Sequence, residues 1–210
     1  MIEDLSILIP ARLGSKGVKF KNRLLLDYTL DSIPSIYRER VFVSTDDPVL
    51  HKRCRDKNIS FFNRPKDLSS DTASMKAVLL HAKNLIKSKY IMVLYLTYPE
   101  RSWQDIEDFL FFFEDNKAKS ALCRKEIKSS PFLMMYQEHG FKGRQIINHN
   151  LYRRQDYPKC FEISHFISAF DRSEIENLNN NLYNKDTIFF EIQNKIDIDT
   201  NLDLREFYEK

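Results

Sequence analysis

An apolar segment near the start of the chain leads directly into a loop that is rich in glycine and positive charge. Residues 5–9 read LSILI, and residues 10–22 read PARLGSKGVKFKN. An apolar run that stops at such a loop is typical of a buried strand whose carboxyl end opens onto an anion. This feature constrains the fold most, because it predicts both a buried strand and a binding site at its end.

The composition of the loop favours a phosphate as that anion. Two of the four glycines of the chain lie in it, at Gly14 and Gly17. Glycine permits a positive φ and a close approach of the ligand, so backbone amides around Gly14 and Ser15 can point at one phosphate. Cations within ten residues of one another add enough charge to neutralise much of a triphosphate: Arg12, Lys16, Lys19 and Lys21.

The loop matches neither GxxxxGKS/T nor GxGxxG, which removes the main support for an ordinary ATPase or a dinucleotide-binding protein. The alternative to a phosphate site is a solvated basic turn after an edge strand. We expect the loop to bind phosphate.

Composition sets broad limits on the function. The 210 residues, 42% of them hydrophobic, suit one globular domain with a small insertion. Thirty-three basic and thirty acidic residues give a net charge of +3, which does not favour a nucleic-acid partner. The three cysteines lack a CxxC pair, and no stretch reaches eighteen apolar residues. We expect a cytoplasmic protein without disulfides, zinc or a membrane segment.

Strand-like and helix-like segments alternate through the first 115 residues. Periodicity predicts strands at 40–44, 59–62 and 90–96, and helices at 24–36, 49–57, 75–88 and 103–114. Asp46 or Asp47 can cap the second helix, and Ser102 can cap the last. This alternation predicts an α/β sandwich with a mainly parallel sheet. Ligands bind at the carboxyl ends of such strands, where the loops at Arg12, Asp46 and Thr97 would gather.

The middle of the chain follows another pattern. Short strands are predicted at 120–124, 132–136, 145–147 and 165–170, without long helices between them. We expect an antiparallel excursion that caps the site or pairs with another copy of the chain.

A second informative stretch, KIDIDTNLDL, lies at residues 195–204. In an extended segment Asp197 and Asp199 face the same side, while Ile196 and Ile198 enter the core. Two carboxylates at a strand end suit Mg²⁺, which prefers one or two carboxylates together with substrate phosphates. The alternative is an ordinary alternating strand followed by a capped helix that starts near Thr200.

Five segments spread over nearly the whole chain form a specific combination. They are IPARxGSKGxxxKN at 9–22, VSTDD at 43–47, RPxxLxSDTAS at 64–74, RQxxP at 154–158 and IDIDTxLD at 196–203. In this order they resemble the bacterial acylneuraminate cytidylyltransferases, the CMP-sialic acid synthetases. The combination is far more specific than any one of its members.

The resemblance implies a fold and an activity. The fold would be a nucleotidyltransferase-like three-layer sandwich, a single domain over 1–210 with an inserted dimerisation element at 125–165. The activity would be transfer of CMP from CTP to the anomeric hydroxyl of a nonulosonic 2-keto-3-deoxy sugar acid, with release of pyrophosphate. The resemblance further implies a homodimer that requires Mg²⁺ and serves surface polysaccharide biosynthesis.

The resemblance also implies roles for individual residues. The triphosphate would be held, and its charge stabilised during transfer, by Arg12, Lys16 and Lys21. The nucleotide would be lined by Asn22, Arg64 and Ser74, together with Gly14 and Ser15 of the loop. Asp197 and Asp199 match the metal-binding pair.

The segments that differ from the family pattern are those that the resemblance assigns to binding of the acceptor sugar. After the strand at 90–96 the family usually reads QPTSPLR, whereas residues 95–101 read YLTYPER, closer at Tyr95 and Thr97 to the pseudaminic acid branch. An RPNGA stretch of the family is replaced by EISHF at 162–166, which removes a cation and a glycine. This pattern favours a nonulosonate other than N-acetylneuraminate, such as a legionaminic- or pseudaminic-type sugar.

Arg154 matches a family arginine and, with Tyr95, is our candidate for binding the acceptor. A guanidinium can bind the sugar carboxylate through two parallel hydrogen bonds. The alternative is a surface arginine paired with Asp156 or Glu162.

Two other functions remain open at this stage. One is a non-catalytic relative that binds a nucleotide and acts as a partner or regulator, which the changed acceptor side motivates. The other is an enzyme of the same fold with a different acceptor. Intact Lys16, Lys21, Asp197 and Asp199 favour the cytidylyltransferase over a non-catalytic relative.

Overall fold

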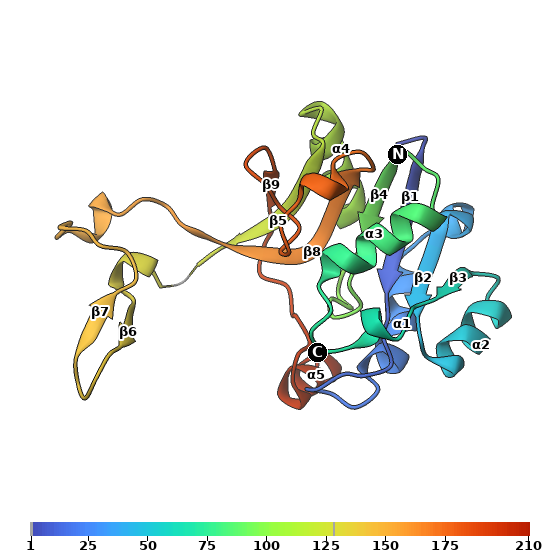
Figure 1. Ribbon diagram of the computed structural model, residues 1–210, viewed down its shortest axis with the longest axis horizontal. Helices are drawn as coiled ribbons and strands as arrows, with labels where there is room; N and C mark the ends of the chain where they lie inside the picture. Colours follow the sequence, from blue (N-terminus) through green and yellow to red (C-terminus); the bar gives the residue numbers. More distant parts are fainter. Residues whose placement is uncertain (1, 128) are drawn as a thin grey trace.

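A sheet of seven strands forms the centre of the computed structural model within the residues that it describes, 2–127 and 129–210. The strand order is β3-β2-β1-β4-β8-β5-β9 (Figure 1). The strands are β1 (Leu5–Pro10), β2 (Val41–Thr45), β3 (Ser60–Asn63), β4 (Tyr90–Val93), β5 (Ser120–Glu126), β8 (Phe161–Asp171) and β9 (Ile188–Glu191). Neighbouring strands pair in parallel except at β8, which is antiparallel to β4 and β5. The predicted α/β fold with a mainly parallel sheet is confirmed.

Strand β1 lies between two parallel neighbours, and all of its residues are buried. Ile7 and Ile9 join the core on one face of the sheet, and Leu8 joins the core on the other. Successive side chains of a strand point to opposite faces, and here both faces are covered. The strand is therefore a continuous apolar run instead of an alternating one.

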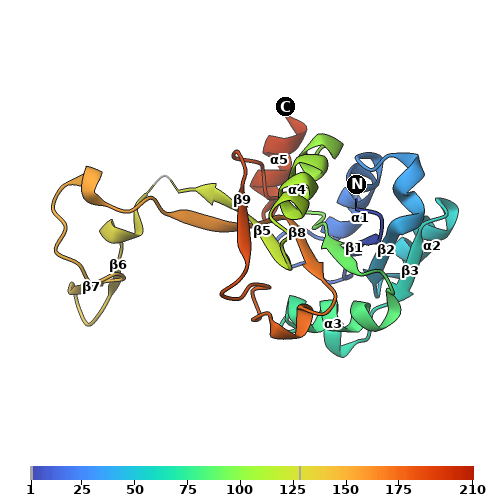
Figure 2. The ribbon, with the colours of Figure 1, turned by 90° about the horizontal axis from the view of Figure 1, so that it is seen from above.

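Helices cover both faces of the sheet, which makes three layers (Figure 2). Helix α3 packs on one face, and the others lie on the opposite face. The helices are α1 (Lys21–Asp31), α2 (Pro48–Asp56), α3 (Met75–Leu85), α4 (Trp103–Asp115) and α5 (Asn201–Tyr208). Helix α5 reaches α1 through Phe207, whose ring meets the ring of Tyr28 edge to face at a centroid distance of 5.1 Å.

Side-chain caps start several helices where the sequence predicts them. Asp47 accepts a hydrogen bond from the amide of Val49 at 2.9 Å. Ser102 forms a capping box with Asp105. Both predicted caps are confirmed, and each satisfies a backbone donor that the first helical turn leaves without a partner.

Several elements differ from the prediction at their ends. Helix α1 runs from Lys21 to Asp31 instead of over 24–36, and a short 3-10 helix, Ser35–Arg40, follows Pro34. Proline cannot donate the hydrogen bond that would continue an α-helix. Strand β4 ends at Val93 instead of 96.

Strand β9 has no counterpart in the sequence prediction. Its four residues pair in parallel with β5, and a run this short between polar loops has no clear period. The predicted strand at 132–136 is also partly wrong. Pro131 starts a 3-10 helix that extends to Leu133, and only Met135–Gln137 form a strand, β6.

Residues 129–160 form an arm that projects from the sheet between β5 and β8 (Figures 1 and 2). Strands β6 and β7 (Gly143–Gln145) form a small antiparallel sheet in the arm. The ring of Phe132 stacks on that of Tyr157, with centroids 5.6 Å apart, and Nε2 of His149 lies 2.6 Å from the Phe132 carbonyl oxygen. The antiparallel excursion is confirmed, whereas its role in pairing and the division into one domain with an insertion stay predictions.

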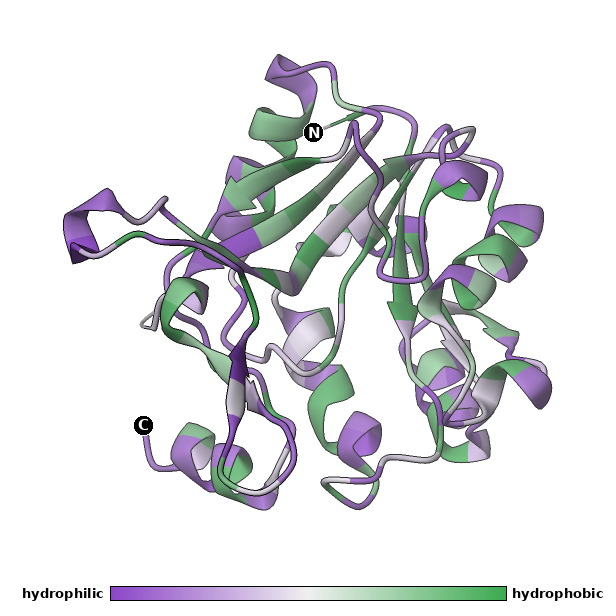
Figure 3. Ribbon diagram, turned by 60° about the vertical axis from the view of Figure 1, so that its left-hand side comes forward, coloured by the Kyte–Doolittle hydropathy of each residue, from purple (hydrophilic) through white to green (hydrophobic). Residues whose placement is uncertain are grey.

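Hydrophobic residues concentrate in the strands, and the loops and outward sides of the helices are mainly hydrophilic (Figure 3). Phe109 and Phe170 are among the largest fully buried side chains and belong to the cores on opposite faces of the sheet. Among the described residues, no helix has both the length and the apolar character of a membrane span.

Candidate nucleotide-binding site

A cavity of about 240 Å³ lies at the carboxyl ends of β1 and β4. These strands are neighbours, but the chain leaves β1 toward β2 and β3 before it returns to β4 on the other side. Open α/β sheets bind ligands at such a switch point. The predicted site residues that line the cavity are Arg12, Gly14, Ser15, Lys21, Asn22, Arg64 and Tyr95.

Hydrogen bonds within the chain fix the phosphate loop, which we define as residues 11–20. The side-chain amide of Asn22 donates to the carbonyl oxygen of Arg12 at 2.8 Å. The amide of Leu13 donates to Asp46 Oδ1 at 2.8 Å. The loops that follow β1 and β2 therefore meet, and Thr97, after β4, lines the same cavity. The predicted gathering of these three loops is confirmed.

Two cations of the phosphate loop are paired with one carboxylate. Arg12 Nη1 lies 2.6 Å from Asp71 Oδ1, and Lys16 Nζ lies 3.1 Å from Asp71 Oδ2. Hydrogen bonds from Arg12 and Lys16 lower the pKa of Asp71. Sequence reasoning did not identify this pairing, because 59 positions separate Asp71 from Arg12 and no periodic pattern connects them.

Lys21 connects the phosphate loop to the C-terminal aspartates. Its side chain is largely buried, and Nζ donates to the carbonyl oxygen of Ile198 at 2.7 Å and to Asp199 Oδ1 at 2.9 Å. The charge of Lys21 is thus already paired at the edge of the cavity. Lys19 lies elsewhere, with its Nζ 5.3 Å from the centre of the Phe20 ring.

The glycines of the phosphate loop differ in their role. Neither has a positive φ; among the described glycines only Gly140 has one. A Cβ at Gly17 would lie 1.8 Å from the carbonyl oxygen of Asp199, whereas a Cβ at Gly14 would meet only Arg12 Nη1 at 3.9 Å. The loop therefore does not use the positive φ that glycine permits, and Gly17 instead allows the loop to pack against the backbone of Asp199.

Arg64 and Ser74 lie on the segment between β3 and α3. Arg64 is buried, its Nε donates to the carbonyl oxygen of Leu68 at 2.8 Å, and burial lowers its pKa. The Ser74 hydroxyl caps α3, accepting a hydrogen bond from the amide of Ala77 at 3.2 Å. Arg64 lines the cavity, whereas Ser74 lies between two lining residues, Ala73 and Met75, and is already used as a cap.

The chain before α5 is extended and anchored beside β4. The amide of Ile198 donates to the carbonyl oxygen of Thr97 at 2.8 Å, and the Ile198 side chain is fully buried. Thr200 then caps α5 in a capping box with Asp203. The capped helix that the alternative interpretation predicts near Thr200 is therefore present. It lies directly after the two aspartates and holds them next to the cavity.

Both aspartates of the predicted metal pair lie near the hydroxyl of Tyr98. That hydroxyl donates to Asp197 Oδ2 at 2.7 Å. Burial, together with the charges of Asp197 and Asp199, raises the pKa of Tyr98 well above its usual value. Asp199 in turn accepts the hydrogen bond from Lys21, and its side chain is 71% exposed.

The carboxylate oxygens of Asp197 and Asp199 are suitable ligands for a divalent cation. Asp197 Oδ1 is buried and has no hydrogen-bond partner among the described residues. A buried carboxylate oxygen without a partner is costly unless a cation or water meets it. Within the described part of the chain, no three His, Cys, Asp or Glu side chains converge. The two carboxylates would leave the other positions of Mg²⁺ to phosphates and water.

Tyr95 lines the cavity, and His165 packs against Tyr95. Their rings lie 5.4 Å apart between centroids. Burial raises the pKa of Tyr95 and lowers that of His165, and His165 Nδ1 is buried without a hydrogen-bond partner in the described structure. His165 belongs to the stretch that departs from the family pattern, which was the only sequence signal for it.

The two residues of the altered 95–101 loop that carry charge have structural roles. Arg101 is buried, and its Nη1 donates to the carbonyl oxygen of Tyr95 at 3.1 Å. Glu100 Oε2 accepts from the amide of Ile196 at 3.3 Å, and Oε1 pairs with Lys210 at 2.9 Å. These contacts fix the loop after β4 to the chain that carries the aspartates.

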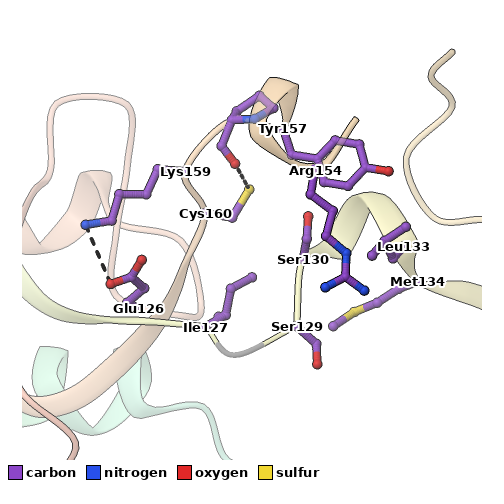
Figure 4. A pocket seen from close by; sticks show the side chains of 11 residues that line it. Glu126, Ile127, Ser129, Ser130, Leu133, Met134, Arg154, Tyr157, Lys159 and Cys160 are labelled. Carbon is purple, nitrogen blue, oxygen red and sulfur yellow. Dashed lines mark hydrogen bonds and ion pairs between the residues drawn. The ribbon is translucent and has the colours of Figure 1, made fainter. Parts of the chain in front are cut away.

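Arg154 does not join the other predicted site residues. It lies in a short 3-10 helix of the arm, Arg154–Asp156, and lines a separate cavity of about 470 Å³. Figure 4 shows its guanidinium directed into that cavity, near Ser129, Ser130 and Met134. The ion pairs of the alternative interpretation are not formed: Asp156 pairs with Arg153, and Glu162 pairs with Lys125.

Comparison with known proteins finds similarity to cytidylyltransferases. Residues 6–108 match a family described as Cytidylyltransferase. An N-acylneuraminate cytidylyltransferase of Streptococcus agalactiae is 28% identical over 160 residues, 71% of this chain and 39% of the relative. The post-translational flagellin modification protein B of Campylobacter coli is 27% identical over 213 residues, 94% of this chain and 90% of the relative. A solved CMP:2-keto-3-deoxy-manno-octonic acid synthetase complexed with CTP superposes with a TM-score of 0.72 at 16% identity, covering 99% and 98% of the two chains.

These matches agree with the geometry of the site. The matched region contains the phosphate loop, Arg64 and Tyr95, which all line the cavity. The match spans only 39% of the streptococcal relative, and the solved structure shares the fold. The resemblance to the acylneuraminate cytidylyltransferases is confirmed: the family match covers the region that lines the cavity, and the relatives are similar to this chain.

Proposed function

We propose that this protein transfers CMP from CTP to the anomeric hydroxyl of a nonulosonic acid and releases pyrophosphate. The observation that carries the proposal is the bond from Lys21, which lines the switch-point cavity together with the phosphate loop, to Asp199 of the C-terminal pair. In the reaction the hydroxyl oxygen attacks the α-phosphorus, the bond to the bridging oxygen of the β-phosphate breaks, and the hydroxyl proton passes to solvent. Such an in-line displacement depends mainly on positioning and on neutralising developing charge.

Arg12 and Lys16 are placed to receive that charge. Arg12 lines the cavity, Lys16 lies beside it on the exposed side, and both hold the carboxylate of Asp71, at 2.6 and 3.1 Å. A phosphate has the same kind of anionic oxygens as a carboxylate and suits the same donors. We assign the β- and γ-phosphates to these two side chains.

Asp197 and Asp199 would hold Mg²⁺, which when bound supplies positive charge to the α-phosphate and the leaving pyrophosphate. Lys21 positions this pair, because it bonds both Asp199 and the backbone of Ile198. Arg64, buried beside the cavity, orients the nucleotide through a fixed guanidinium.

The acceptor half favours a sugar acid other than N-acetylneuraminate. Tyr95 and His165 present one hydroxyl and one imidazole where the family pattern has a glutamine and a glycine. These larger side chains would narrow the space for the acceptor and change the hydrogen-bonding groups that the acceptor meets. A legionaminic- or pseudaminic-type acid is our proposed acceptor, and biosynthesis of a surface polysaccharide in the cytoplasm is the proposed role.

Completion of the acceptor site requires a second copy of the chain. Arg154 lies on the arm and lines a different cavity from Tyr95 within one chain. An arginine that binds the acceptor carboxylate from this position must therefore act at the site of a partner. We propose a homodimer in which each arm reaches the cavity of the other copy.

Mixing two inactive variants tests this arrangement. Arg154→Ala should raise the acceptor KM about tenfold or more and leave the KM for CTP nearly unchanged. A one-to-one mixture with Asp199→Ala, assayed at low acceptor concentration, should recover about a quarter of wild-type activity, because one site in each mixed dimer is intact. A mixture no more active than the sum of its parts would exclude the shared site.

Nucleotide selectivity is the direct test of the activity. We expect CTP, and not ATP, GTP or UTP, to raise the melting temperature, and Mg²⁺ to strengthen the effect. Pyrophosphate release with CTP and a panel of nonulosonic acids then identifies the acceptor. No shift with any nucleotide would contradict the activity. A CTP shift without pyrophosphate release from any acidic sugar would support the non-catalytic relative or a different acceptor.

A further inference from the structure

Asp71 lies where the triphosphate is expected. Its two carboxylate oxygens meet Arg12 Nη1 and Lys16 Nζ, and Asp71 lines the same cavity as the phosphate loop. Arg12 Nη1 also lies 3.4 Å from the carbonyl oxygen of Ser69. The cations assigned to the β- and γ-phosphates are thus paired with an anionic group of the protein itself.

The Asp71 carboxylate and a triphosphate cannot both bind Arg12 and Lys16, because both are negatively charged. Arg12 Nη1 and Lys16 Nζ each present a few donors, and Asp71 already accepts from both of them. A triphosphate in the cavity would add several negative charges next to this carboxylate. Like charges a few ångströms apart repel one another. The carboxylate must therefore leave when polyphosphate arrives.

The segment that carries Asp71 can move while both of its ends stay fixed. On one side Arg64 holds the carbonyl of Leu68, and on the other Ser74 caps α3. Between them, Ser70 makes short-range hydrogen bonds to Asp67 and Thr72. Release of Asp71 from the phosphate loop breaks neither anchor.

We propose that Asp71 is a positioning residue that holds Arg12 and Lys16 in the nucleotide-free protein and exchanges places with the polyphosphate of the nucleotide. The pairing holds the two cations at Asp71, a residue that lines the cavity, before the nucleotide binds, which limits the side-chain ordering that binding requires. The pairing also weakens the affinity of the protein for polyphosphate, because polyphosphate must displace the Asp71 carboxylate. This inference rests on the proposed role of the phosphate loop and extends it to segment 69–73.

Binding of inorganic tripolyphosphate tests the exchange without the sugar or the base. Asp71→Asn removes the competing charge, and Asp67→Asn makes the same charge change four positions away on an exposed side chain. By calorimetry, Asp71→Asn should bind tripolyphosphate about fivefold more tightly than the wild type, which corresponds to about 1 kcal/mol for an exposed ion pair. Asp67→Asn should stay within about twofold of the wild type, since distant surface charges are screened.

The possible results separate the exchange from the proposed function. Wild type and Asp71→Asn binding tripolyphosphate equally, or Asp71→Asn binding more weakly, would overturn the exchange while leaving the phosphate loop in place. No binding by either protein would overturn both. Hydrogen exchange gives a second readout: the amides of 69–73 in the wild type should exchange faster with tripolyphosphate present, and unchanged or slower exchange would contradict the proposal. Asp71→Ser replaces Asp71→Asn if the latter does not melt cooperatively.

Discussion

The phosphate loop and the arm present their predicted site residues in opposite ways. In and directly after the loop, Arg12, Lys16 and Lys21 each meet a carboxylate of the same chain. On the arm, Arg154 has no ion-pair partner among the described residues, and the Phe141 and Tyr152 side chains are almost completely exposed. Large apolar side chains that nothing covers mark a surface that meets another molecule.

The difference agrees with the proposed arrangement, in which the nucleotide half of the site forms within a single chain and the acceptor half is completed by the arm of a second copy. The nucleotide half is held by buried strands, capped helices and ion pairs. The arm keeps its shape through its own hairpin and the stacking of Phe132 on Tyr157. Substitutions in the two regions should therefore differ in kind: those in the first should change stability or chemistry, and those in the second should change association.

The largest expected effect is on catalysis in the nucleotide half. Asp199→Ala should lower kcat by about 10³-fold, because loss of the proposed metal ligand would remove positive charge from the transition state. Its melting temperature should fall little, since the side chain is 71% exposed. Asp186→Ala, at an exposed loop position, is the control and should keep full activity. Near-normal pyrophosphate release by Asp199→Ala would show that Asp199 is not a ligand of the catalytic metal.

The next effect is on stability and depends on pH. Asp47 is buried and pairs with Arg23, with Nε to Oδ2 at 2.7 Å. Burial raises the pKa of Asp47, but hydrogen bonds from Arg23 and the amide of Val49 outweigh it, so the pKa lies below its usual value. Asp47→Ala should lower the free energy of unfolding by about 3 kcal/mol at pH 7, because it leaves a charge without its partner.

The sign of the pH dependence follows from the lowered pKa. A carboxyl group with a lower pKa in the folded state stabilises the fold above its unfolded pKa of about 4, and this stabilisation disappears as the pH falls. In urea titrations the gap between wild type and Asp47→Ala should shrink below about pH 4. Asp27→Ala, which removes a half-exposed partner of Lys57, is the control and should cost less than about 1 kcal/mol. A gap that persists in acid would assign the effect to packing instead of charge.

Two glycines of the same loop provide a matched pair for the third prediction. Gly17→Ala should cost about 2 kcal/mol, because its Cβ would lie 1.8 Å from the carbonyl oxygen of Asp199 and the loop must shift. Gly14→Ala should change stability by less than about 0.5 kcal/mol, since its nearest atom is the end of a flexible arginine. Urea unfolding measures both. Equal costs would mean that the loop does not pack against the aspartates as described.

The smallest effect on stability is expected on the arm. Phe141→Ser should leave the free energy of unfolding of the chain within about 0.5 kcal/mol, because the side chain makes no core contact. The same change should weaken the dimer, which sedimentation velocity over a range of concentrations would detect. If Phe141→Ser lowered the free energy of unfolding as much as Gly17→Ala, the arm and the phosphate loop would not differ in the way described. Unchanged association would remove Phe141 from the dimer surface.

The elements that sequence reasoning predicted well are those whose signal is local. The buried strand β1, the Asp47 and Ser102 caps and the switch-point position of the phosphate loop depend on neighbouring residues and on general rules for α/β sheets. The contacts it missed join distant positions. The pairing of Asp71 with Arg12 and the packing of Gly17 on Asp199 depend on how two segments approach in space, which no short pattern records.

The bond between Lys21 and Asp199 has a consequence for the order of folding. These residues are 178 positions apart, and contacts at such separations form late because the intervening chain must first be ordered. During synthesis the phosphate loop emerges early, yet its anchor is made only near the end of this sequence. A chain interrupted before Asp199 would contain the loop and most of the sheet but would lack the contact that holds Lys21, so such fragments should not compete with the full-length protein for nucleotide.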